Sequence, residues 1–171
     1  MRSSVPAEPF VTARLDVLPL RVAHAAEMAV VLGDPALHTF IGGAPSTPEV
    51  LRARYERLVA GSPDPSVAWW NWVLRVRDTG RLAGTVQATV TGGGDHAEVA
   101  WVVGTAWQGR GLASEAAAGL VGLLREQGVR TIVAHVHPGH QASAAVARSA
   151  GLSATPERQD GEVRWRLTAT P

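Results

Sequence analysis

The feature that most constrains the fold is a glycine-containing turn between an apolar strand and an amphipathic helix. The run from Trp107 to Ala116 reads WQGRGLASEA, with glycines at positions 109 and 111. Two glycines one residue apart let the backbone bend so that its N–H groups converge on one point. The helix that follows adds unpaired N–H donors and the positive end of its dipole. The turn is therefore expected to bind an anion, and a pyrophosphate fits it.

Composition excludes several kinds of site. The 171 residues, 46% of them apolar, fit a single domain over residues 1–171, with residues 1–10 expected as a flexible N-terminal segment. Sixteen basic and fifteen acidic residues give a net charge of +1 without long runs of either sign, which disfavours a nucleic-acid partner. The chain has no cysteine, which excludes disulfides, thiolate metal sites and cysteine-bound intermediates.

No apolar stretch approaches the ~18 residues of a membrane span, and the N-terminus lacks the apolar core of a signal peptide. The sequence thus predicts a cytoplasmic protein with a small-molecule or peptide partner and neither a nucleic-acid nor a membrane partner.

Hydrophobic periodicity predicts an α/β fold with a mixed, α+β type of sheet. Strands are expected over residues 13–20, 67–77, 81–90, 97–103 and 131–136 and in a last hairpin that turns at Asp160-Gly161. Helices are expected over residues 24–32, from the cap at 46–49 to about Gly61, and over 111–127 and 141–150. This order contains one strand–helix–strand crossover, and the glycine turn lies inside it.

A nicotinamide-binding site is the first alternative for such a turn. That site needs the spacing G-x-G-x-x-G and an acidic residue at the end of the next strand. Here Ser114 stands at the third glycine position, and the next strand ends in His135-Val136-His137 without a carboxylate. Three expected antiparallel strands also precede the turn, which is atypical of a dinucleotide fold.

The residues Gln108-Gly109-Arg110-Gly111-Leu112-Ala113 have the form Gln/Arg-x-x-Gly-x-Gly/Ala and resemble the acetyl-coenzyme A loop of the GNAT N-acetyltransferase superfamily. Four further segments are similar to its RimJ/RimL-like branch, which acetylates protein N-termini and small amines. These segments are Thr12-Ala13-Arg14-Leu15, Gly33-Asp34-Pro35, the strand from Glu98 to Val103, and Ser114-Glu115-Ala116. The resemblance covers nearly the whole chain.

The resemblance implies a mostly antiparallel sheet of about seven strands, with a central splayed parallel pair and four flanking helices. It also implies that the pantetheine arm of acetyl-coenzyme A pairs with the strand edge at 101–103, where a backbone N–H near Val102 polarises the thioester carbonyl. The pyrophosphate would rest on the N–H groups of 109–114. The expected coenzyme-binding residues are Trp101, Val102, Val103, Gln108, Gly109, Arg110, Gly111, Leu112, Ala113, Ser114 and His140.

The chain departs from the family's pattern at the group that protonates the leaving thiolate: Ala147 stands at the usual tyrosine position, and His140 at the position of the usual asparagine. Ser143 is the nearest substitute in the RimL-like pattern. Alternatively, its hydroxyl only satisfies backbone N–H groups at a helix N-terminus.

A general base is needed because an amine attacks only when neutral. At pH 7 a lysine-like amine with a pKa near ~10.4 is disfavoured by about 4.6 kcal/mol, and an α-amino group near ~7.8 by about 1 kcal/mol. Glu98, at the start of the strand that carries the coenzyme edge, is the favoured base. His96 and a purely surface role for Glu98 are the alternatives, and Glu115 is expected to complement the helix dipole.

Two other groups have simpler interpretations. His135, His137 and His140 lack a nearby carboxylate or thiol, so no metal site is expected. Trp70 and Trp72 are expected to fill the core, and Trp69 is expected at an acceptor groove or a dimer contact.

The sequence therefore predicts an enzyme, an acyl-coenzyme A-dependent N-acetyltransferase that moves acetyl directly to a primary amine in a ternary complex. A catalytically inactive, coenzyme A-binding regulatory module of the same fold is the alternative. The acceptor stays open among a peptide N-terminus, an aminoglycoside-like antibiotic, a polyamine and an amino acid. A homodimer is expected.

Overall fold

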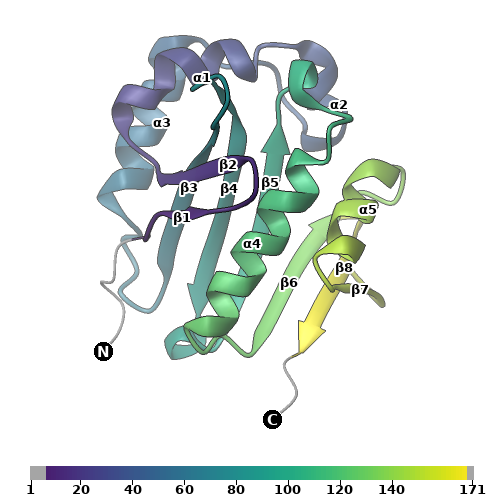
Figure 1. Cartoon of the computed structure of the whole chain (residues 1–171). Helices are drawn as coiled ribbons and strands as arrows, with labels where there is room; N and C mark the ends of the chain where they lie inside the picture. The colour runs from purple at the N-terminus through teal and green to yellow at the C-terminus, as the bar shows by residue number, and fades with distance from the viewer. Residues whose placement is uncertain (1–6, 169–171) are drawn as a thin grey trace.

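The computed structural model describes residues 7–168 and shows one mixed sheet with helices on both faces (Figure 1). Its strand order is β1-β2-β3-β4-β5-β6-β8-β7. The strands are β1 (Phe10–Val11), β2 (Leu15–Pro19), β3 (Ala68–Val76), β4 (Leu82–Thr91), β5 (His96–Val103), β6 (Thr131–Val136), β7 (Ser153–Gln159) and β8 (Glu162–Thr168). The helices are α1 (Ala25–Val31), α2 (His38–Ile41), α3 (Pro48–Ala60), α4 (Leu112–Glu126) and α5 (Gln141–Ser149).

Local sequence explains several of these boundaries. The Thr47 side chain accepts a hydrogen bond from the Val50 N–H at 3.2 Å, and Pro48 takes the first helical position, so α3 begins there. Asp160 and Gly161 have φ angles of 53° and 81°, the left-handed pair that a tight β7–β8 turn requires.

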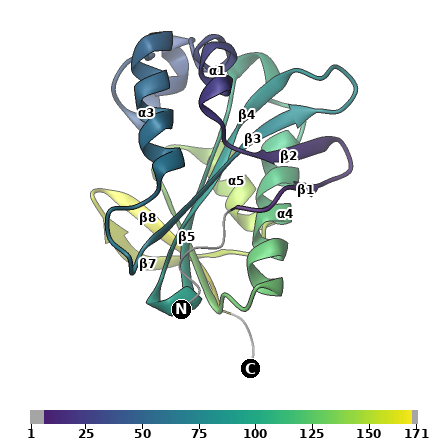
Figure 2. The ribbon, with the colours of Figure 1, turned by 90° about the vertical axis from the view of Figure 1, so that its left-hand side faces the viewer.

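The sheet separates two apolar cores, and β3 contributes to both (Figure 2). Trp72 is fully buried in the larger core, under α4 and α5, as predicted, while the next residue, Val73, is fully buried in the smaller core under α1 and α3. This alternation follows from the two-residue period of a strand. Loss of a fully buried aromatic side chain such as that of Trp72 costs about 3–5 kcal/mol.

The parallel pair at the centre of the sheet is short. β5 and β6 pair only from His96 to Glu98 and from Thr131 to Val133, and beyond these residues no further pairing between the two strands is present in the described chain. Every other neighbouring pair of strands is antiparallel. The predicted splayed pair is therefore confirmed, and a gap opens between the C-terminal halves of β5 and β6.

The structure adds to the expected count of strands and helices. β1 has two residues and α2 has four, too few for a periodic pattern to be recognised in the sequence. The last strand, β8, lies between β6 and β7, so the final hairpin joins the sheet through its second strand.

Residues 1–6 of the segment expected to be flexible lie outside the described residues. Within residues 7–10, the backbone carbonyl of Glu8 accepts a hydrogen bond from the Trp72 indole N–H at 2.7 Å. Phe10 packs edge-on against the same indole, with 5.9 Å between the ring centroids. Across residues 7–168, no helix has both the length and the apolar character needed to cross a membrane.

Candidate active site

The glycine loop, Gln108–Ser114, lies between the end of β5 and the first turn of α4. Gly109 and Gly111 both have φ of 77°, a left-handed conformation that L side chains rarely adopt, and Gly111 is the N-cap of α4. Among the described residues, no hydrogen-bond acceptor is recorded for the backbone N–H groups from Gly109 to Ser114. Unpaired N–H groups at the positive end of a helix dipole are suited to bind an anion such as a phosphate group.

Side chains near the loop contact the protein itself. Arg110 lies over the Trp107 ring at 5.2 Å and reaches the Ala106 carbonyl at 3.4 Å. Leu112 is buried in the larger core. The anion site in the glycine loop is thus made of backbone groups.

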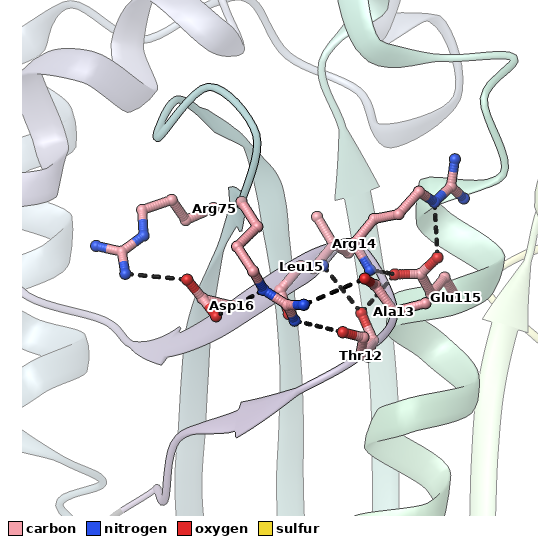
Figure 3. A network of polar contacts seen from close by, with 8 residues as sticks. Thr12, Ala13, Arg14, Leu15, Asp16, Arg75 and Glu115 are labelled. Carbon is pink, nitrogen blue, oxygen red and sulfur yellow. Dashed lines mark hydrogen bonds and ion pairs between the residues drawn. The ribbon is translucent and has the colours of Figure 1, made fainter.

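A polar network fixes the loop to the β1–β2 turn (Figure 3). Glu115, in the first turn of α4, accepts hydrogen bonds from the Thr12 hydroxyl at 2.5 Å, the Arg14 N–H at 2.8 Å and the Arg14 guanidinium at 2.9 Å. Arg14 also donates to the Arg110 carbonyl at 2.7 Å. Burial raises the pKa of Glu115, but the bonds from Thr12 and Arg14 together outweigh it and hold that pKa below its usual value.

The same turn is also tied to β3. Arg75 and Arg77 both bind the Asp16 carboxylate, at 3.1 and 3.3 Å, and Arg77 donates to the Thr12 carbonyl as well (Figure 3). The hydrogen bond from Arg75 is the main reason that the pKa of Asp16 lies below its usual value. The two networks hold the β1–β2 turn between the sheet and α4.

The backbone N–H and C=O groups of successive residues in β5 point alternately toward β4 and toward β6. The Gly104 N–H donates to the Ala83 carbonyl at 2.8 Å, so the even-numbered residues of β5 direct their N–H and C=O groups toward β4. Val102 therefore faces β4, where a Cβ on Gly84 would lie 2.1 Å from the Val102 oxygen. Its backbone groups are paired within the sheet, which argues against the expected role of a Val102 N–H toward a thioester.

The odd-numbered residues Trp101 and Val103 face the gap. The Val103 carbonyl accepts a hydrogen bond from the Gln108 side chain at 3.0 Å, which fixes the direction of this edge and ties the glycine loop to it. The N–H and C=O of Trp101 and the N–H of Val103 lie where the pairing with β6 has ended. An extended chain with amide groups fits this edge, as an added strand would.

Ser143 comes from α5 and meets β5 across the gap. Its hydroxyl oxygen accepts a hydrogen bond from the Trp101 indole N–H at 3.0 Å. No helix N–H in the described chain is found to donate to this hydroxyl oxygen, whose partner is the Trp101 indole. The Ser143 O–H therefore keeps its proton available for another acceptor.

His140 precedes α5 and contacts α2 rather than a phosphate-binding group. Its ring stacks on Phe40 at 4.3 Å with an angle of 7° between the planes, and His137 packs against the same Phe40 ring. Burial, with a smaller contribution from the His137 charge, lowers the pKa of His140 below its usual value and favours the neutral ring.

Glu98 lies on the face of the sheet opposite α4, at the point where β5 and β6 separate. His135 Nδ1 is 2.7 Å from Glu98 Oε1, and Arg164 Nε donates to His135 Nε2 at 3.2 Å. Because Arg164 is always a donor, Nε2 must be the acceptor, and the proton of the neutral ring lies on Nδ1. His135 thus donates to Glu98, and within residues 7–168 no hydrogen bond is found to the Oε2 oxygen of that carboxylate.

A cavity of about 460 Å³ lies on the same face, between the sheet and the three N-terminal helices. Its floor includes Asn71, Thr85 and Gln87, and it reaches Ala100 and Val102 on β5, beside the gap. Tyr55 of α3 also lines the cavity, and burial raises its pKa to about 12, so its hydroxyl is a neutral donor.

Trp70 and Trp72 contact the core as predicted, and a second cavity lies beside Trp69 and Trp70. Trp70 packs against the larger core, where Trp72 is buried. Trp69 and Trp70 line a separate cavity of about 510 Å³ beside the C-terminal part of α3. Its position leaves the predicted acceptor-side or dimer role of Trp69 open to test.

Sequence reasoning missed two parts of the site. His135 was considered only as a metal ligand, and the alternation that places it beside Glu98 and Arg164 depends on strand pairing that a single sequence does not contain. The cavity was missed because its lining comes from many elements. No group of three histidine, aspartate or glutamate side chains arranged to hold a metal occurs within residues 7–168.

Comparison with known proteins gives a consistent result. A model of the acetyltransferase (GNAT) domain matches residues 14–153. No curated protein sequence matches the chain. The structure resembles a GNAT-family acetyltransferase from Bacillus anthracis, with 17% identity, a TM-score of 0.77 and coverage of 94% of this chain and 98% of that one.

Two ligand-bound structures are also similar. RimL, a ribosomal L7/L12 α-N-protein acetyltransferase in complex with coenzyme A, has 17% identity, a TM-score of 0.77 and coverage of 94% and 98% of the two chains. The microcin C7 self-immunity acetyltransferase MccE, in complex with acetyl-CoA and AMP, has 14% identity, a TM-score of 0.78 and coverage of 98% and 99%. At these identities the likeness establishes the fold.

Proposed function

Because the chain belongs to the acetyltransferase (GNAT) family and is an acyl-coenzyme A-dependent acetyltransferase, we propose that it transfers acetyl from acetyl-coenzyme A directly to a primary amine. In the ternary complex, the pyrophosphate binds the free N–H groups of the glycine loop. The pantetheine arm pairs with Trp101 and Val103 in the gap, and the acceptor amine occupies the cavity. The proposed coenzyme site agrees with the coenzyme A and acetyl-CoA that similar structures contain.

One observation carries this proposal: the gap joins the glycine loop to the cavity. The five steps along the strand from Gly104 back to Val99 span about 17 Å. A coenzyme anchored at the loop therefore brings its thioester near the point where the two strands separate. Glu98 lies at that point, and the cavity opens there at Ala100.

Glu98 is proposed as the general base. Its Oε1 is held by His135, and its Oε2 is free to accept a proton from the ammonium group, directly or through one water. The neutral amine nitrogen then forms a bond to the thioester carbon, and the carbon–sulfur bond breaks. Acetyl ends on nitrogen, the second amine proton leaves to solvent, and Glu98 then releases the first proton to solvent.

The Trp101 N–H, the one of the two nearer the point where the strands separate, is proposed to stabilise the negative charge that develops on the carbonyl oxygen, while the Val103 N–H pairs with the pantetheine arm. Ser143 is proposed to protonate the leaving thiolate. Its oxygen accepts from Trp101, so its own proton is directed elsewhere, and a water replaces that proton from solvent. His135 is a positioning residue in this scheme, because it acts through Glu98.

The test combines coenzyme A calorimetry with thiol release from acetyl-coenzyme A, using a peptide α-amine and an alkylamine as acceptors. Wild type is expected to bind coenzyme A and to acetylate at least one of them. Glu98→Gln is expected to lower kcat/KM by about 100-fold, more for the alkylamine because its proton is harder to remove. His96→Ala, two residues earlier on the same face, is the matched control and should retain activity.

Two results would contradict the proposal. Coenzyme A binding without thiol release for any amine would favour the regulatory module that the sequence left open. An equal loss of kcat/KM in Glu98→Gln and His96→Ala would show that Glu98 is not the general base. The homodimer and the cytoplasmic location stay predictions, and light scattering checks the first.

A further inference from the structure

The charge lining the cavity is unusual for an enzyme that binds an amine. Arg54 of α3 is the one formally charged residue among those that line it, apart from the titratable His38, and no aspartate or glutamate is present among the described lining residues. An acceptor with several ammonium groups would place them against a cation without a carboxylate to bind them. This disfavours the polyamine and aminoglycoside-like acceptors that the sequence left open.

Arg54 also has no ion pair or hydrogen bond recorded in the described chain, although its helix contains carboxylates. Two positions earlier, Arg52 lies 3.7 Å from Glu56, one turn along the same helix. Arg54 instead lines the cavity, and its charge is close enough to Tyr55 to oppose, in part, the rise that burial causes in the pKa of that hydroxyl. An unpaired guanidinium beside a neutral hydroxyl donor forms a fork that binds a carboxylate or a phosphate.

The cavity also sets a distance between the two ends of an acceptor. Arg54 lies on α3, whose C-terminal part packs over β3, whereas the reacting amine must reach Ala100 on β5. β3 and β5 are separated by one strand, so their axes lie about 10 Å apart.

The floor between these ends offers further contacts. The side chains of Asn71, Thr85 and Gln87 have no recorded hydrogen bonds within the described residues, and they lie on adjacent strands. Leu51 and Leu58 of α3 supply an apolar wall. A chain with amide groups and small apolar side chains would satisfy both surfaces.

We infer that the acceptor is a small amine that carries an anionic group, a carboxylate or a phosphate, about 10 Å from its nitrogen, and that Arg54 binds this group. A short peptide with a free N-terminus and a free carboxylate has this form. The inference rests on the proposed function, since it assigns the acceptor of the same site.

The experiment compares pairs of acceptors that share one amine-bearing chain and differ in whether that chain ends in an anionic group. Trialanine is compared with trialanine amide, and 5-aminopentyl phosphate with 5-aminopentanol, in thiol-release assays. In each pair the anionic member is expected to have a kcat/KM about tenfold higher or more, because a charged hydrogen bond is lost in the other. The larger ratio of the two identifies carboxylate or phosphate as the preferred group.

Arg54→Ala is expected to abolish this preference by lowering kcat/KM for the anionic acceptors alone, mainly through KM. Arg54→Glu is expected to reverse it. Arg52→Ala, on the same helix but outside the cavity lining, is the matched control and should keep the wild-type ratio. Calorimetry with coenzyme A should give unchanged affinity in all three variants.

Equal turnover of the charged and neutral members by wild type would overturn the inference and leave the acetyltransferase proposal intact. So would a preference that persists in Arg54→Ala. If no amine is acetylated, the proposed function fails instead. In that case, calorimetry can test the anion site with the coenzyme A-loaded protein. Binding of N-acetyltrialanine but not of its amide would support the site, provided that Arg54→Ala abolishes this binding.

Discussion

The two ends of the gap between β5 and β6 are built in different ways. At one end the glycine loop presents backbone N–H groups from six consecutive residues, Gly109–Ser114. At the other end the cavity presents side chains from α1, α3, β3, β4 and β5 and from the segments between them. On the proposed function, the glycine loop would bind its anion through backbone conformation, and the cavity would bind its ligand through side-chain chemistry.

This difference predicts which substitutions each end tolerates. A backbone site is insensitive to the side chains that surround it and sensitive to any change of φ. A side-chain site shows the opposite behaviour. The predictions below test this contrast, beginning with the largest expected effect.

Gly111→Glu should lower the affinity for coenzyme A by about 100-fold or more, because a side chain is strained at φ of 77° and a carboxylate there repels the pyrophosphate. Calorimetric titration with coenzyme A measures this. Arg110→Ala is the control at the neighbouring position and should change the affinity by less than about threefold, since that guanidinium contacts Trp107 and Ala106.

The contrast between the two ends would be contradicted if Arg110→Ala lowered the affinity for coenzyme A as much as Gly111→Glu. The loop would then bind through a charged side chain rather than through its backbone. Circular dichroism of both variants shows whether folding accounts for any loss.

Ser143→Ala should lower kcat by about tenfold with little change in KM, because water replaces the hydroxyl as the acid. Trp101→Phe should have a smaller effect, since it removes the N–H that orients Ser143 but leaves the hydroxyl. Steady-state kinetics with the best acceptor checks both. An unchanged kcat in Ser143→Ala, over a pH range in which thiol release limits the rate, would assign protonation to solvent.

Glu115→Gln should lower the free energy of unfolding by about 1 kcal/mol at pH 7, because it weakens the contacts with Thr12 and with the half-exposed Arg14. The pKa of Glu115 is lower in the folded protein than its usual value of 4.5, so its stabilising effect is present above that value. The effect disappears as the pH falls through the folded pKa. Urea unfolding at pH 7 and below pH 4 measures this change.

Glu56→Gln is the control for that experiment, since Glu56 forms an exposed pair with Arg52 on α3. It should change stability by no more than about 0.3 kcal/mol at either pH. If the Glu115 and Glu56 variants responded equally to pH, the network at the β1–β2 turn would not be what holds the glycine loop.

The contrast also explains how far sequence reasoning reached. The glycine loop, the helix that follows it and the strand from Thr131 to Val136 were predicted because each is contiguous and has a regular pattern. Ser143 and Trp101 were each predicted as site residues, but the hydrogen bond between them was not, because they are 42 residues apart. The hydrogen bond between His135 and Glu98 was not predicted for the same reason. Nor was the position of Arg54 in the lining of the same cavity as the side chains of its floor.

Val102 shows a second limit of prediction from the sequence. The strand that contains it was predicted correctly, but whether an N–H faces the gap or β4 depends on a shift of one residue in the pairing. Hydrophobic alternation defines the faces of the sheet on which side chains lie. It does not define the in-plane direction of the backbone groups, which the Gly104–Ala83 hydrogen bond reveals.

The short pairing of β5 with β6 has a consequence for the stability of the whole molecule. Three residue pairs on β5 and β6 join a five-stranded part of the sheet to a three-stranded part. On the proposed function, a bound coenzyme would act as a further strand between them, and its binding free energy would add to the free energy of unfolding. The lifetime of the enzyme in a cell would then follow the supply of its own donor. Hydrogen exchange at Trp101 and Val103 would slow as the coenzyme concentration rises.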